Sequence, residues 1–90
     1  MIHYTKFVKY HNQMVTLTRI SLRDARFFYK IGRDIYIVED LTEFDRKEEL
    51  RLFFCANKNQ GVKDFDTVCK IFRSRNARKP RKTLLYFLLE

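Results

Sequence analysis

The sequence predicts an α+β fold in which residues 1–90 form a single small domain, with an antiparallel or mixed sheet of four to five strands and two helices packed on one face. Several short runs are dense in β-branched and aromatic residues, as strands usually are. One later segment instead repeats its apolar residues with the period of an amphipathic helix. The length suits one domain, and an apolar content of 46% supplies its core.

The first twenty residues are expected to form a β-hairpin. Along residues 2–10, apolar side chains such as Tyr4 and Val8 alternate with polar ones, which is the pattern of a half-buried strand. Residues 13–20 form a second run rich in Val, Leu and Thr. The dipeptide His-Asn separates the two runs, and Asn tolerates the left-handed backbone that tight hairpin turns require.

Residues 21–38 admit two interpretations. Ser21 followed by Asp24 resembles an N-cap arrangement, which favours a helix. Against it, the aromatic and β-branched residues of 27–31 and 35–38 favour two strands joined by a turn that contains glycine. We predict the two strands.

The segment after residue 41 is expected to be a helix. Thr42 is a suitable N-cap, and residues 45–50 are strong helix formers. The apolar residues that follow do not fall on one helical face, so a strand beginning near Leu50 is the alternative. Residues 57–61 are expected to form a loop.

The pattern of residues 64–76 predicts the most regular helix of the chain. Its apolar residues recur at the spacing i, i+3, i+4, i+7; they are Phe65, Val68, Cys69 and Phe72. Asp64 is suited to cap its N-terminus. After it, residues 83–89 form a continuous apolar run, which predicts a buried central strand.

The net charge of +8 and the isoelectric point near 9.8 are the strongest functional signals of the sequence. Residues 1–37 carry a net charge of +5 and residues 67–90 carry +6, whereas residues 38–66 carry −3. Such a field attracts phosphates, anionic lipid or an acidic protein. We therefore expect a polyanionic partner.

The most specific basic segment covers residues 73–82, in which six of ten residues are cationic and none is acidic. Crowding these charges costs self-repulsion, which a polyphosphate backbone relieves while it releases its own counterions. Arginine predominates, and its planar guanidinium suits phosphate and guanine. The predicted nucleic-acid-binding residues here are Arg73, Arg75, Arg78, Lys79, Arg81 and Lys82. A solvated loop after a helix is the alternative.

A second basic set is interleaved with aromatic residues in the segment 19–33. Single-stranded nucleic acid needs this combination, because cations contact the backbone while exposed rings stack on bases. The predicted binding residues of this set are Arg23, Arg26, Lys30, Arg33 and Tyr29. Tyrosines are preferred over phenylalanines as stacking rings because a phenol tolerates solvent; the candidates are Tyr4, Tyr10, Tyr29 and Tyr36.

These signals predict a non-enzymatic nucleic-acid-binding protein without catalytic residues or a cofactor, with RNA or single strands preferred over duplex DNA. Glycine occurs only at positions 32 and 61, so the chain contains no glycine-rich phosphate loop. In its short length, its abundance of Lys, Phe and Tyr and its scarcity of Gly and Pro, the chain resembles small bacteriophage and viral accessory proteins.

Two other functions are kept as alternatives. A protein inhibitor or adaptor would dock on a host nuclease, toxin or defence protein through the acidic segment 39–49. The simpler interpretation of that segment is a solvated helix start. A small metal-independent endoribonuclease would use His3 or His11 as a general base.

No metal site or disulfide framework is predicted. Cys55 and Cys69 are too few and too widely separated, and His3 and His11 lie at opposite ends of one expected strand. We expect no signal peptide, because the N-terminus has no uninterrupted apolar run, and the longest apolar run has six residues where a membrane span needs about twenty. We expect a cytoplasmic protein with no membrane partner.

Overall fold

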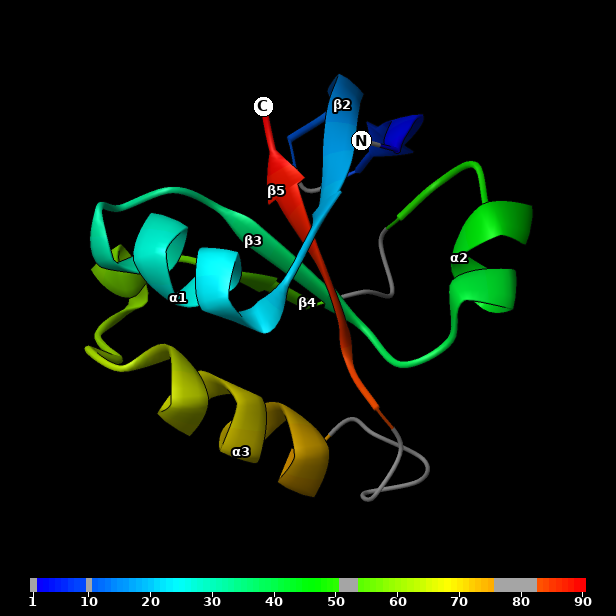
Figure 1. Cartoon of the computed structure of the whole chain (residues 1–90). Coiled ribbons are helices and arrows are strands. Elements are labelled where there is room, and N and C mark those ends of the chain that lie inside the picture. Colours follow the sequence, from blue (N-terminus) through cyan, green and yellow to red (C-terminus); the bar gives the residue numbers. More distant parts are fainter. Residues whose placement is uncertain (1, 10, 51–53, 76–82) are drawn as a thin grey trace.

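The chain forms one five-stranded antiparallel sheet within the residues that the structure describes, which are 2–9, 11–50, 54–75 and 83–90 of this computed structural model (Figure 1). The strands are β1 His3–Val8, β2 Gln13–Ile20, β3 Ile35–Val38, β4 Phe54–Ala56 and β5 Leu85–Leu89. The helices are α1 Leu22–Lys30, α2 Leu41–Arg46, the 3-10 turn η1 Lys58–Gln60 and α3 Phe65–Arg75. The strand order is β1-β2-β5-β3-β4, which confirms the α+β class.

The N-terminal hairpin is confirmed. β1 and β2 pair antiparallel from His3 opposite Thr18 to Val8 opposite Gln13. Asn12 takes a φ of 52°, the left-handed conformation that the turn requires and that Asn tolerates. Residue 10 lies outside the described residues.

The predicted strand over residues 27–31 is wrong, because residues 27–30 belong to the helix α1 and Ile31 is its C-cap. The Oγ of Ser21 accepts a hydrogen bond from the backbone N–H of Asp24 at 3.1 Å, which caps the first turn. Ala25 and Tyr29, four residues apart, then share one buried face of the helix. The second predicted strand of this region is confirmed as β3.

The predicted helix after residue 41 is shorter than expected. Asp40, not Thr42, caps α2 by accepting hydrogen bonds from the backbone N–H groups of Thr42 and Glu43. The chain becomes extended at Lys47, and Phe54–Ala56 forms β4. The alternative of a strand in this region is therefore correct for β4.

The sheet is covered on both faces. Alternate residues of β3 contribute to two separate clusters, since Ile35 and Ile37 pack beneath α1 and α3 while Tyr36 and Val38 pack on the side of α2. Two helices thus share one face as predicted, but they are α1 and α3. The helix predicted after residue 41 is α2, which packs with the other cluster. Figure 1 shows α2 on the opposite side of the sheet. β5 lies at the centre of the strand order, as its apolar run indicates.

The sheet curls until its two edges approach each other. Beyond α2 the chain lies along the outer edge of β1, where the backbone N–H of Phe7 donates to Glu48 O and that of Leu50 donates to Phe7 O. Only four residues further, the chain pairs with β3 at the other edge. Four residues span at most about 14 Å, whereas five flat strands would place their edges about 19 Å apart. The sheet is therefore curled and not flat.

Among the described residues, no helix has the length and apolar character needed to span a membrane.

Candidate nucleic-acid interface

The outward face of α1 presents an exposed ring between two cations. Ala25 and Tyr29 turn the opposite face of the helix into the core. Phe27 is consequently 58% exposed, and Arg23 one turn before it and Lys30 one turn after it are exposed as well. Residues three or four apart on a helix are surface neighbours. This face therefore offers a flat apolar surface flanked by positive charge.

A hollow next to Lys30 is lined by three lysines from different parts of the chain. Its described lining consists of Lys30, Lys58, Asn59 and Lys63, and its volume is about 360 Å³. The Nζ of Lys58 donates to the backbone carbonyl of Lys30 at 3.0 Å, so one of its three donors is used. No acidic side chain stands among these lining residues. Three converging cations favour an anionic ligand.

Asn57 holds the turn that carries two of these residues. Its Oδ1 accepts a hydrogen bond from the backbone N–H of Asn59 at 2.8 Å and thereby caps η1. Its Nδ2 donates to the carbonyl of Gly32 at 3.0 Å, just beyond the end of α1. The turn ends at Gly61, whose φ of 99° suits glycine. The hollow is thus fixed by side-chain-to-backbone bonds between sequence-distant segments.

Tyr29 anchors the same region from the inside. The ring is only 1% exposed, and its hydroxyl donates to the carbonyl of Val62. Burial raises the pKa of Tyr29, and the carboxylate of Asp64 adds to the rise, so the phenol stays a neutral donor at neutral pH. The expectation that Tyr29 stacks on a base is therefore corrected: both faces of this ring are covered by the core.

Two other tyrosines considered as stacking rings, Tyr4 and Tyr36, also pack into the fold. Tyr36 is 1% exposed, and Tyr4 is half-buried in edge-to-face contact with Phe44 and Phe87. Tyr10 lies outside the described residues. The ring that the structure offers to solvent on the basic face is Phe27.

Two of the predicted arginines near α1 engage other parts of the protein. Arg26 forms an ion pair with Asp66 of α3, with 2.9 Å between Nε and Oδ1. Arg33 is exposed, donates to the carbonyl of Leu89 at 3.4 Å and lies 5.9 Å from the centre of the Phe28 ring. Arg26 therefore brings less net charge to the surface than the sequence suggests.

The predicted C-terminal basic set is described only at its beginning. Arg73 is half-buried and Arg75 exposed in the last turn of α3. Burial raises the pKa of Tyr86 to about 12. The positive charges of Arg73 and Arg26 partly offset this rise, because both guanidinium groups lie near this phenol. Arg26 of the first set and Arg73 of the second thus lie on two helices that the Arg26–Asp66 ion pair joins. The predicted Arg78, Lys79, Arg81 and Lys82 lie outside the described residues.

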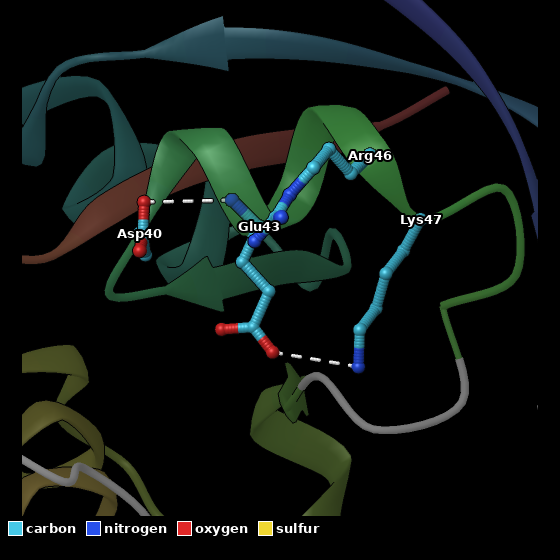
Figure 2. Close-up of a pocket in the computed structure, with 4 residues that line it drawn as sticks. All are labelled: Asp40, Glu43, Arg46 and Lys47. Carbon is cyan, nitrogen blue, oxygen red and sulfur yellow. Dashed lines mark hydrogen bonds and ion pairs between the residues drawn. The ribbon is translucent and has the colours of Figure 1, made fainter.

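The acidic segment 39–49 has intramolecular partners (Figure 2). Around α2, a second hollow of about 340 Å³ is lined by Asp40, Glu43, Arg46 and Lys47. Asp40 caps the helix, and Glu43 pairs with Lys47 at 3.4 Å between Oε1 and Nζ. Glu49 pairs with Lys9 across the closing edge of the sheet. Asp40, Glu43 and Glu49 therefore each contact other parts of the fold.

Sequence reasoning missed Phe27, Lys58 and Lys63. The signal for Phe27 was present, because a helix beginning after the Ser21 cap places it opposite Ala25 and Tyr29. Lys58 lies within the expected loop of residues 57–61 and Lys63 follows it, and no local pattern relates them to Lys30.

Comparisons with protein-family models, with curated proteins and with solved structures found no match to this chain.

Proposed function

We propose that this protein binds single-stranded nucleic acid, RNA by preference, and acts as a non-enzymatic accessory factor. The observation that carries the proposal is the convergence of Lys30, Lys58 and Lys63 on one hollow. Each phosphodiester of a nucleic-acid backbone carries one negative charge, and such a set of ammonium groups can neutralise neighbouring phosphates with release of counterions from the nucleic acid.

The exposed ring of Phe27 favours binding of a single strand over binding of a duplex. Phe27 adjoins Lys30, so a strand with one phosphate in the hollow has a base within reach of the ring. Stacking of one base on an aromatic side chain contributes about 1–3 kcal/mol. Bases in a duplex are already stacked on each other and do not offer their faces to a protein ring. Arg23 supplies a further charge on the same helix face.

The salt dependence of binding tests the hollow directly. We expect the double variant Lys58→Ala/Lys63→Ala to bind fluorescent oligouridine more weakly at low salt. The slope of log K against log[salt] should become shallower by about 0.7 for each phosphate that the variant no longer neutralises. Fluorescence anisotropy across a salt series measures both quantities.

The double variant Lys9→Ala/Lys47→Ala is the matched control, since it removes the same charge from lysines paired with Glu49 and Glu43. Its slope should equal that of the wild type. Equal flattening in both double variants would show that only the overall charge matters, and a wild type that ignores oligouridine at low salt would overturn the proposal.

A further inference from the structure

Three side chains with metal-binding chemistry meet at one end of the curled sheet. His11 comes from the turn between β1 and β2, Asp34 precedes β3, and Cys55 lies in β4. One nitrogen, one carboxylate oxygen and the sulfur of these residues all lie within 4.8 Å of one another. β1 and β4 are opposite ends of the strand order, so the curl of the sheet is what brings the three groups together.

The carboxylate of Asp34 is already oriented. Asn57 Nδ2 donates to its Oδ1 at 2.6 Å, while its Oδ2 lies 3.9 Å from His11 Nε2. A hydrogen-bonding partner of this kind fixes the direction of a ligating carboxylate. The His11 Nε2 atom is shielded from solvent, although the side chains of His11 and Asp34 are 24% and 29% exposed. The cluster is therefore sheltered and still has a path to solvent.

We propose that His11, Asp34 and Cys55 form a binding site for a divalent transition-metal ion of the zinc class. Imidazole nitrogen, carboxylate oxygen and thiolate sulfur are the donors that zinc takes in proteins. In a tetrahedral zinc site the ligand atoms lie about 3.3–3.8 Å apart, so a movement of about 1 Å closes the site. A water molecule from the open side completes the coordination.

The charge balance favours such an ion. As the sulfur–metal bond forms, the Cys55 thiol releases its proton to solvent. The resulting thiolate and the Asp34 carboxylate together carry two negative charges, which the ion neutralises. Thiolate ligands select zinc-like ions over magnesium and calcium.

Cobalt(II) is the probe, because a cobalt–thiolate bond gives a charge-transfer absorption band in the near ultraviolet. The untagged full chain, freed of metal with a chelator, is titrated with Co²⁺. We expect the band to saturate at one equivalent and to disappear on addition of Zn²⁺. Cys55→Ser should abolish the band, and His11→Asn should weaken Co²⁺ binding more than about tenfold.

Each variant has a matched control elsewhere in the chain. Cys69→Ser and His3→Gln should bind Co²⁺ like the wild type, since neither residue belongs to the cluster. Asn57→Ala should weaken binding about tenfold by releasing the carboxylate of Asp34.

The proposal is overturned if wild-type protein shows no thiolate band, or if the band is lost in Cys69→Ser and kept in Cys55→Ser. His11 lies in a turn, so His11→Asn is expected to fold even where Cys55→Ser does not. Co²⁺ affinity unchanged in a folded His11→Asn variant would equally overturn the site, leaving a contact between His11 and Asp34 beside a half-buried thiol.

Discussion

Lys6 shows how one charged residue becomes part of the core. It stands on the apolar face of β1 and is only 8% exposed. Its Nζ donates to the carbonyls of Asp45 and Lys47 at 3.1 and 3.0 Å and lies 5.2 Å from the centre of the Phe44 ring. The last carbonyls of a helix have no partner within the helix. Lys6 therefore closes the C-terminal end of α2.

We predict that Lys6→Met destabilises the protein by about 1–3 kcal/mol, because the two carbonyls lose their buried donor. Urea unfolding followed by circular dichroism measures the change. Lys9→Met, at an exposed position of the same hairpin, should shift stability by no more than about 0.5 kcal/mol. If the two variants were equally stable, Lys6 would have no capping role.

At the scale of one element, one face of α1 packs in the core and the opposite face is the candidate binding surface. The buried face, with Ala25 and Tyr29, joins the helix to β5 and α3. The exposed face carries Phe27 between Arg23 and Lys30, where the ring contributes little to the core. A single exposed apolar residue is common on protein surfaces, but an exposed ring between two cations offers a nucleic acid both stacking and charge.

Phe27→Ala is expected to weaken oligouridine binding by about 1–3 kcal/mol, at least fivefold in Kd, while the free energy of unfolding changes by no more than about 0.5 kcal/mol. Fluorescence anisotropy and urea unfolding measure the two effects. Ile31→Ala removes a comparable exposed apolar side chain, 54% exposed, one turn further along, and should bind like the wild type. Phe27→Trp should retain binding. Equal losses in Phe27→Ala and Ile31→Ala would argue against stacking.

The same helix shows the limit of local sequence patterns. Its aromatic residues suggest a strand, and the Ser21 cap suggests a helix. The helix prevails because Ala25 and Tyr29 fit together against the sheet and the hydroxyl of Tyr29 finds the carbonyl of Val62. Tertiary packing of this kind routinely overrides the weak intrinsic preference of a short segment.

At the scale of the whole molecule, buried groups with a raised pKa make the free energy of unfolding fall as the pH becomes alkaline. Burial raises the pKa of Tyr86 from 10.0 to about 12. The unfolded chain loses this proton near pH 10, whereas the folded chain holds it up to about pH 12. The contribution of this phenol to stability is therefore complete below pH 10 and is lost between pH 10 and 12.

The midpoint of urea unfolding should fall more between about pH 9 and pH 11 in the wild type than in Tyr86→Phe, which lacks the titrating phenol. Lysine titration in this range affects both proteins alike, so the difference between them isolates Tyr86. An equally steep fall in the variant would assign the effect to other groups.

The sequence by itself determined the features that depend on local periodicity and composition. The α+β class, the hairpin of β1 and β2, the amphipathic helix α3 and the buried strand β5 all follow from the spacing of apolar residues. The excess of positive charge and its concentration toward both ends of the chain are likewise properties of composition. They predict a polyanionic partner, and the binding experiments above test it.

Only the tertiary structure decided which side chains meet. Lys30, Lys58 and Lys63 share a hollow because Asn57 and Tyr29 fasten two loops to the end of α1. The three groups of the candidate metal site meet because the sheet curls until its edge strands approach. No period along the chain encodes such contacts, since they depend on how strands and loops far apart in sequence pack together.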